Sequence, residues 1–356
     1  MIRCLLTIGL VLCSLAAQAQ RTPPWQPLNE ESLALYRQGK YEQSTAVAKK
    51  GLEMAERLRG PEHQGAALFL NRIAENYRLQ ARFEEAEPLY QRALAIVEAT
   101  LGAEHQRMAA LLTNFGMVRV VQGRHGEAEK LLDRSLGIYE RSGNSDVAQV
   151  ALTLNGLARI YSSRGEPERA VSALKRAVEI SEKGRGPETG EVARTLANLG
   201  ELYTQHNRYA EAEAAYKRAL AIWEKVSGVN HPLSAPTLNG LGALYLAQDR
   251  LDDAIVTYRK AIEVVDNTLD RGHPNMAESL AGAASVHVLL KEYEVAEAFY
   301  TRALEIRESA LGPRHPATIR TMEALAEVHF KLGQNAEGEK LESRALELRT
   351  RKPPAR

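Results

Sequence analysis

A motif that recurs every 42 residues constrains this chain more than any other feature of its sequence. In the copy at residues 67–105, the apolar residues Leu70, Ile73 and Tyr77 recur at the spacing of one helix face. A turn near Ala81 separates them from a second apolar helix face. The pair at 73–74 reappears, without insertion or deletion, as Phe115-Gly116, Leu157-Ala158, Leu199-Gly200, Leu241-Gly242, Ala283-Ala284 and Leu325-Ala326. Self-similarity at such a period predicts a solenoid of stacked helix pairs.

The repeat also predicts the domain organisation, because one continuous array accounts for nearly all of the chain. We expect an all-α solenoid of about eight helix-turn-helix repeats over residues 29–349. A terminal repeat needs a more polar outer face, since nothing stacks on it. The departures from the motif at Glu31, Ser32, Gly338 and Glu342 therefore indicate two cap repeats. The expected parts are an N-terminal cap at 29–61, six regular repeats at 62–314, a C-terminal cap at 315–349 and a disordered tail at 350–356.

The joints between repeats carry their own 42-residue columns. One column is small or turn-forming: Gly60, Gly102, Asn144, Gly186, Gly228, Asp270 and Gly312. These residue types tolerate the left-handed conformation that often ends a helix. Three residues later stand His63, His105, His231, His273 and His315, of which the last three precede proline. We interpret these histidines as part of the helix boundary and expect no metal site, because successive repeats keep them apart.

The N-terminus has the pattern of an export signal. A short positive segment at 1–3 precedes an apolar run from Cys4 to Ala17, and Ala17-Gln18-Ala19 forms a small-x-small cleavage site. The apolar run is shorter than the roughly 20 residues that a membrane-spanning helix needs. We expect a signal peptide at 1–19, a Pro-rich linker at 20–28 and an exported protein, with a bacterial periplasm as its compartment. The alternative is a secreted protein or one anchored by an uncleaved N-terminal segment.

Composition and motifs exclude several function classes. The 46 basic and 45 acidic residues balance, so no nucleic-acid partner is expected. Both cysteines, Cys4 and Cys13, lie within the expected signal, which leaves the mature chain without a thiol for catalysis or metal binding. The sequence contains no H-E-x-x-H, G-x-S-x-G or P-loop motif. We therefore expect neither an enzyme nor a cofactor, and the oligomeric state stays open.

The repeat is similar to a known family. Its positions Leu196, Leu199, Gly200, Tyr203, Ala212, Tyr216 and Ala219 resemble the tetratricopeptide repeat (TPR) signature. The 42-residue period is longer than the usual 34 and resembles the kinesin-light-chain subtype, as does the stretch from His231-Pro232 to Gly242. The resemblance implies a right-handed superhelix whose first helices line a concave groove. It further implies that the groove holds an extended peptide or a helix of a partner protein.

Asparagines on the expected first helices are the leading candidates for that site. Asn71, Asn155 and Asn239 share one column, and Asn114 and Asn198 share the next. An amide can pair with a peptide backbone through both its donor and its acceptor, and the resemblance implies this role. The alternative is that these amides make structural bonds between neighbouring helices. One or two turns further on, Glu75, Arg78, Arg159 and Glu201 complete the candidate groove.

The later part of the groove is predicted to be more apolar. Leu246, Val288 and Phe330 occupy the column that holds Arg78 in the early repeats. Exposed apolar residues there suit a partner helix, and the alternative is that they belong to the core. We thus expect an exported scaffold that binds a protein partner. The other possibilities are a structural subunit of an assembly, or an accessory factor of an envelope or surface-polymer machinery whose groove holds saccharide.

Overall fold

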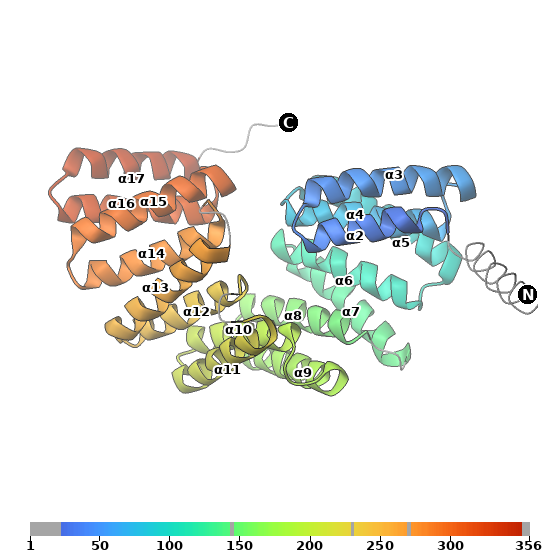
Figure 1. The fold of residues 1–356 in the computed structure, drawn as a ribbon, viewed down its shortest axis with the longest axis horizontal. Helices are drawn as coiled ribbons and strands as arrows, with labels where there is room; N and C mark the ends of the chain where they lie inside the picture. The colour runs from blue at the N-terminus through green and yellow to red at the C-terminus, as the bar shows by residue number, and fades with distance from the viewer. Residues whose placement is uncertain (1–22, 143–145, 229–230, 269–271, 351–356) are drawn as a thin grey trace, which may run out of the picture. The chain divides into compact units, whose positions relative to one another are not determined.

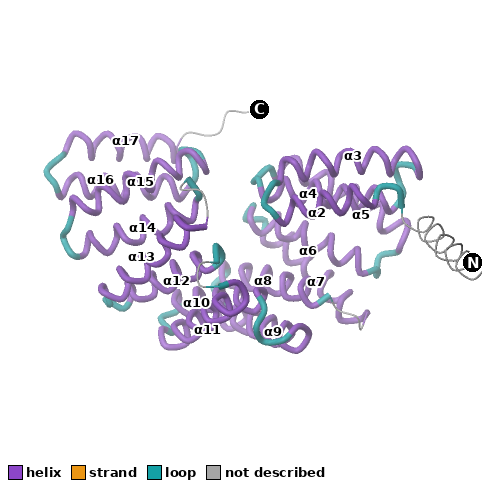
Figure 2. The backbone as a smooth tube through the Cα atoms, viewed as in Figure 1, coloured by secondary structure: helices purple, strands orange, loops and turns teal. Residues whose placement is uncertain are grey.

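Helix follows helix through the part of the chain that the computed structural model describes, residues 23–142, 146–228, 231–268 and 272–350. All regular structure in these ranges is α-helical (Figures 1 and 2). The first helices of the repeats are α2 (Gln26–Arg37), α4 (Gln64–Leu79), α6 (Gln106–Val121), α8 (Val147–Ser163), α10 (Gly190–Gln205), α12 (Ser234–Ala247), α14 (Pro274–Leu289) and α16 (Pro316–Lys331). The second helices are α3 (Tyr41–Arg59), α5 (Phe83–Leu101), α7 (His125–Ser142), α9 (Pro167–Arg185), α11 (Tyr209–Ser227), α13 (Leu251–Thr268), α15 (Tyr293–Leu311) and α17 (Asn335–Thr350). The prediction of an all-α solenoid of helix-turn-helix repeats is confirmed.

The helices form two compact units, one up to Ile160 and one from Tyr161, with the boundary inside α8. Within each unit a second helix packs on the first helix of its own repeat and on that of the next, as α5 does with α4 and α6. Neighbouring first helices also touch, as α10 does with α12 and α12 with α14. Each first helix in the interior of a unit therefore has protein on several sides, while one face stays available.

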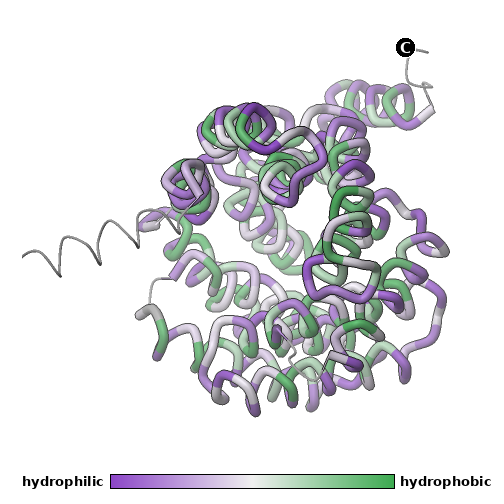
Figure 3. The backbone as a smooth tube through the Cα atoms, turned by 90° about the vertical axis from the view of Figure 1, so that its right-hand side faces the viewer, coloured by the Kyte–Doolittle hydropathy of each residue, from purple (hydrophilic) through white to green (hydrophobic). Residues whose placement is uncertain are grey.

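Two columns of small residues let the second helices approach their neighbours. Each member is fully buried: Ala86, Ala128, Ala170, Ala212, Ala254 and Ala296 in one column, and Ala93, Ser135, Ala177, Ala219, Ala261 and Ala303 in the other. Larger residues such as Tyr90, Ile96 and Leu132 fill the space between helices and are also fully buried. Hydrophobic and hydrophilic positions alternate along the helices accordingly (Figure 3). The core of each unit is thus a layer of interlocking large and small side chains.

The turn inside each repeat is the place where the backbone adopts a positive φ. The residues at this turn are Gly39, Ala81, Gly123, Gly165, Asn207, Asp249, Lys291 and Gly333, with φ between 57° and 77°. Around Ala81 the N–H of Arg82 donates to the Tyr77 carbonyl at 2.8 Å. That bond belongs to the Schellman motif, which satisfies the last free carbonyls of a helix. The 42-residue period therefore includes one left-handed residue in every repeat.

At the joints between repeats, the expected backbone conformation was wrong. Gly60, Gly102, Gly186, Gly228 and Gly312 have φ of 85–92°, but ψ is near 160° rather than near the left-handed helical value. This extended region is essentially restricted to glycine, because a Cβ would clash there. Asn144 and Asp270, which break the glycine column, lie outside the described residues.

Four histidines of the joint column cap the helices that follow them, whereas His231 lies three residues before α12 and bonds to the N–H of its N-cap residue Leu233. His63, His105, His231, His273 and His315 each accept, through Nδ1, a hydrogen bond of 3.0–3.2 Å from the backbone N–H two residues later. Such a bond satisfies one of the N–H groups that have no partner within the helix. The interpretation of these five histidines as helix-boundary residues is confirmed.

The two ends of the described chain differ slightly from the expected boundaries. Helix α2 begins at Gln26, inside the segment expected to be a linker, because Pro27 stands in the first turn, where no backbone donor is needed. Trp25 is buried against His63, with ring centroids 5.7 Å apart. Thr350, expected in the tail, is the last residue of α17, and its hydroxyl donates to the Leu346 carbonyl. The expected signal peptide, residues 20–22 and the rest of the tail lie outside the described residues.

Candidate functional site

Two of the candidate asparagines lie together in the first unit. Asn71 on α4 accepts a hydrogen bond of 3.1 Å from the amide of Asn114 on α6. Asn114 is buried, and Asn71 is half-buried. Asn71 also lines a mostly apolar hollow of about 100 Å³, next to Leu68 and Leu111. The pair thus makes the structural bond between neighbouring first helices and still leaves Asn71 at the edge of a recess.

The other three asparagines differ in how their amides are used. Asn155 is buried and donates to the Ala151 carbonyl, one turn earlier on α8, at 2.7 Å. Asn198 on α10 is half-buried and also has an interaction partner. Asn239 on α12 is 3% exposed, and its carbonyl accepts from the Ser279 hydroxyl at 2.8 Å. The buried amide nitrogen of Asn239 has no acceptor at normal hydrogen-bond distance, and it makes only a weak hydrogen bond to the Glu278 carboxylate.

Two of the four charged candidates form an ion pair with each other, and the other two are exposed. Glu75 is buried and forms a two-pronged ion pair with Arg78, at 3.0 and 3.1 Å, and it also accepts the hydroxyl of Tyr90. This carboxylate is therefore engaged within the protein. Arg159 and Glu201 are exposed, and Glu201 accepts from Gln205 at 3.4 Å. The role of all nine candidates in binding a ligand stays a prediction.

A polar hollow of about 320 Å³ opens on the first helices of the second unit. We call it the α12–α16 hollow. It is lined by Asn239 from α12, Glu278 from α14 and Arg320 from α16, and by Tyr258, Tyr300 and Arg307 from the second helices α13 and α15. Three consecutive first helices thus form its floor, and side chains of second helices reach it between them. Only Asn239 among these six was a candidate on sequence grounds.

Tyrosines reach the hollow because glycines on the first helices leave room for their rings. A Cβ on Gly282 of α14 would lie 2.2 Å from the Tyr258 ring, and one on Gly242 of α12 would lie 2.9 Å from it. The Tyr300 hydroxyl lies 2.8 Å from the Ser285 hydroxyl of α14, within hydrogen-bond distance. A glycine column facing a tyrosine column, 42 residues apart in successive repeats, is a sequence signal that could have identified these residues.

The carboxylate of Glu278 has an unusual environment. More than a third of the residue is exposed, yet the walls of the hollow limit the water around its carboxylate. This desolvation raises the pKa of Glu278, against an opposing influence of Arg307. The neighbouring Glu201 raises the pKa further. The hydrogen bond from the Asn239 amide lowers the pKa, and its effect is the smallest of the four. The hollow therefore combines cationic, acidic and amide groups in a restricted volume.

The apolar column formed by Leu246, Val288 and Phe330 belongs partly to the hydrophobic core. Val288 packs against the buried cluster that joins α14 to α17. Phe330 is 37% exposed, and its ring lies so close to Gly338 that a Cβ there would be 2.6 Å away. Its position explains the glycine at 338, where the six preceding repeats have alanine. This column offers less free apolar surface than the sequence pattern suggests.

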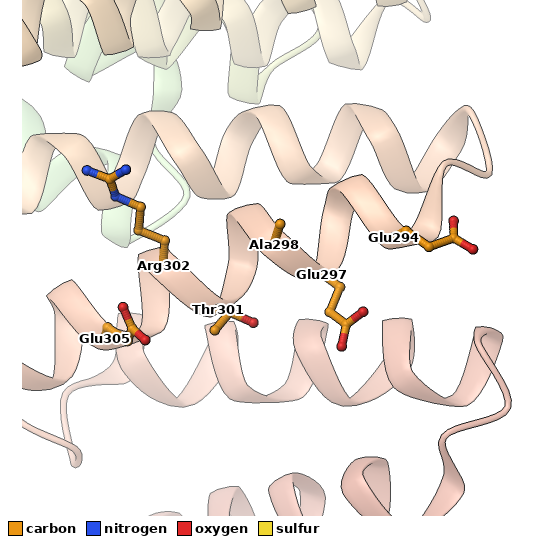
Figure 4. A pocket seen from close by; sticks show the side chains of 6 residues that line it. All are labelled: Glu294, Glu297, Ala298, Thr301, Arg302 and Glu305. Carbon is orange, nitrogen blue, oxygen red and sulfur yellow. The ribbon is translucent and has the colours of Figure 1, made fainter.

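A shallow recess of about 640 Å³ on α15 lacks the features of a site. Its six lining residues all lie on this one helix, and they include Glu294, Glu297, Arg302 and Glu305 (Figure 4). No buried polar group points to a ligand there. In the described residues, no group of three or more His, Cys, Asp or Glu side chains is placed to hold a metal ion. None of the described helices is long and apolar enough to cross a membrane.

Comparison with known proteins identifies the repeats. The family model described as Tetratricopeptide repeat matches residues 28–99, 65–141, 106–183, 191–267, 233–309 and 275–351. No curated protein matches the chain significantly.

Several solved structures are similar to this chain. The apo form of the quorum sensor NprR from B. thuringiensis is 14% identical, with a TM-score of 0.69 over 96% of this chain and 93% of that one. A Rap protein complexed with Competence and Sporulation Factor is 16% identical, with a TM-score of 0.61 over 91% and 97%. Kinesin-light-chain TPR-like repeats from P. anserina are 20% identical, with a TM-score of 0.48 over 60% and 100%. Since the family model covers most of the chain, the protein belongs to the tetratricopeptide repeat family.

Proposed function

We propose that the protein is a binding scaffold that holds a peptide or helix of a partner protein along its first helices. The observation that carries this proposal is the α12–α16 hollow, where the buried amide nitrogen of Asn239 is only weakly satisfied by the Glu278 carboxylate. A poorly satisfied buried donor costs free energy, and a ligand that brings an acceptor to it offsets this cost. A main-chain carbonyl of a peptide is an acceptor of the right kind.

The rigid framework supports recognition rather than catalysis. Helices already ordered before binding present their side chains at a low entropic cost, which suits a scaffold. The Rap protein with the same fold was solved in complex with Competence and Sporulation Factor, which supports a comparable role for this chain. We propose no reaction for the protein.

Selection from a library of displayed linear peptides tests the proposal. The purified protein serves as bait, and the affinities of selected peptides are compared between the wild type and the double variant Asn71→Ala/Asn239→Ala. We expect each selected peptide to bind the double variant about fivefold more weakly, because one hydrogen bond, worth about 1 kcal/mol, is lost in the hollow that the peptide occupies. Asn267→Ala, an exposed asparagine on the second helix α13, is the matched control and should bind like the wild type.

Two outcomes would count against this function. Recovery of no binding peptide from the library would contradict a peptide-binding role. Equal affinity of the wild type and the double variant, with unchanged helicity by circular dichroism, would remove the asparagines from the site.

We also propose that the protein is exported and that residues 1–19 are removed. The support is the positive segment, apolar run and small-x-small pattern at the N-terminus. Intact-mass analysis of the protein isolated from the periplasm of an expressing bacterium should give a chain that starts at Gln20. A chain of full mass in the cytoplasmic fraction would contradict export.

A further inference from the structure

An apolar hollow of about 100 Å³ lies between the first helices α4 and α6 in the first unit, and we call it the α4–α6 hollow. The apolar residues that line it are Ala67 and Leu68 of α4, Val97 of α5, and Ala110 and Leu111 of α6. Ala67, Val97 and Leu111 are at most 4% exposed, which places them at its floor. Leu68 and Ala110 are half-buried. The hollow is therefore an apolar recess that solvent can reach.

The polar residues at the rim of this hollow bond to each other across the two helices. Arg107 of α6 donates to the side-chain carbonyl of Gln64 on α4 at 2.8 Å, and the Asn114 amide donates to that of Asn71 at 3.1 Å. Gln64 and Asn71 are about two helical turns apart, so these bonds lie at opposite ends of the hollow. A buried water needs about two to four polar partners, which the apolar floor does not supply. An apolar group is thus a better occupant than water.

Ala110 is smaller than the residues at the equivalent positions of the neighbouring repeats. These positions, 42 residues before and after it, hold Leu68 and Leu152. A leucine side chain exceeds that of alanine by an isopropyl group, and at position 110 this group is missing from the gap between α4 and α6. The chain therefore leaves open the space that a further leucine would fill.

The volume of the hollow favours a branched aliphatic side chain over an aromatic ring. An apolar cavity of about 150 Å³ holds benzene, and the α4–α6 hollow is smaller than that. An aliphatic side chain that enters the hollow loses its contact with water. It also gives the floor residues the dispersion contacts that an empty recess lacks.

We propose that the α4–α6 hollow binds one branched aliphatic side chain, that of leucine or isoleucine, from a peptide that lies along the first unit. This inference rests on the proposed peptide-binding function and specifies the side chain that the peptide carries at one position. The side chain of the partner takes the place of the leucine that the protein lacks at Ala110.

The variant Ala110→Leu tests this proposal, because the protein then fills the hollow with a side chain of its own. Peptides are selected on the wild type from the library of displayed linear peptides. We expect one group of them to share leucine or isoleucine at a constant position and to bind Ala110→Leu at least tenfold more weakly, as expected when a buried aliphatic side chain is displaced. Ala110→Val adds less volume and should weaken binding by a smaller factor.

A change in the peptide connects the loss of affinity to the hollow. Replacement of the shared leucine by alanine should weaken binding to the wild type at least tenfold. The same replacement should weaken binding to Ala110→Leu less than twofold, because the hollow of this variant is already filled and the two changes remove one interaction. Equal losses with both proteins would place the leucine of the peptide elsewhere and overturn the inference.

The stability of the unliganded protein provides an arm that needs no peptide. Ala110→Leu fills an apolar recess, so its melting temperature should be unchanged or higher than that of the wild type. A lower melting temperature would show that α4 and α6 leave no such space and would overturn the inference. Ala298→Leu is the matched control, since Ala298 lies on the exposed face of α15 (Figure 4). It should leave peptide affinity unchanged.

The inference and the proposed function fail in different ways. Selected peptides that all bind Ala110→Leu as tightly as the wild type would overturn the aliphatic site and leave peptide binding intact. An aromatic residue at the position that Ala110→Leu affects would overturn the choice of side chain. If the library gives no binding peptide, the proposed function fails, and this inference fails with it.

Discussion

Single glycines on the first helices control how far the tyrosines of the second helices reach. Gly282 allows the Tyr258 ring to pass α14, since a Cβ there would lie 2.2 Å from the ring. We predict that Gly282→Ala lowers the free energy of unfolding by about 1–3 kcal/mol, the usual cost of overpacking a core. Urea unfolding followed by circular dichroism measures this loss. Gly126→Ala on α7 is the control, because no atom lies within 4 Å of its Cβ position. Equal stabilities of the two variants would show that the close fit does not matter.

Protonation of His315 contributes to the pH dependence of stability. Desolvation lowers the pKa of His315, and the nearby Arg320 and Arg307 add to this effect. The unfolded chain therefore binds a proton more readily than the folded one, so this contribution to stability is complete above the usual histidine pKa and is lost as pH falls below it. His315→Asn keeps a capping acceptor that does not titrate. We expect the melting temperature of this variant to fall less than that of the wild type between pH 7.5 and pH 5. An identical fall in both proteins would exclude His315 as the source.

Some residues of the candidate site could be predicted from the sequence, and others could not. The asparagine columns were visible at 42-residue spacing, and two members, Asn71 and Asn239, do line hollows. Arg307 could have been found as the charged member of a buried column. The pairing of Glu75 with Arg78 and Tyr90 could not be predicted, because it depends on how α4 and α5 pack against each other.

At the scale of helices and turns, the left-handed residue in each repeat is the most regular feature. Ala81 and Lys291 adopt φ of 57° and 61°, where a side chain costs about 1–2 kcal/mol relative to glycine. We predict that Ala81→Gly and Lys291→Gly each raise the free energy of unfolding by up to about 1 kcal/mol. Denaturant titration checks this gain. Gly123→Ala, at the equivalent turn, should lower it by a similar amount. A loss of stability in the two glycine variants would contradict the account of the turns.

Helix boundaries were predictable where a residue type is forced by sterics and less so elsewhere. The histidine column predicted where first helices begin, and Nδ1 caps confirm it at α4, α6, α14 and α16, whereas α12 begins three residues after His231. The joint glycines were found, but their extended conformation with positive φ could not be distinguished from the left-handed one by residue type alone. The N-terminal limit at Gln26 was missed, because proline disfavours helix interiors yet suits the first turn.

At the scale of the whole molecule, a repeat protein depends on its terminal helices. Helix α17 covers the apolar cluster of the last repeats through Ala345, Leu341 and Leu348. We predict that truncation after Gln334 exposes this cluster and causes aggregation or self-association, because stacked repeats need a capping helix. Size-exclusion chromatography with light scattering measures the outcome. A monodisperse, fully helical truncated protein would contradict the capping role.

The period predicted the architecture because each repeat contacts mainly its sequence neighbours, so a local pattern is enough to specify the stack. The ligand could not be predicted in the same way. The α12–α16 hollow collects residues from five helices spread between Asn239 and Ala324, and it combines members of repeat columns, such as Asn239 and Tyr258, with a departure from a column at Arg307. The ligand of such a protein depends on the side chains at particular positions, which the repeat period does not specify.

Hydrogen–deuterium exchange in the presence of a selected peptide shows whether ligands bind along the first helices. Backbone amides that the bound peptide protects are located by mass spectrometry of proteolytic fragments. If ligands bind along the first helices, protection should be strongest there, above all in α12, α14 and α16 around Asn239 and Arg320. Protection confined to the exposed face of second helices, such as the α15 surface around Arg302, would contradict it.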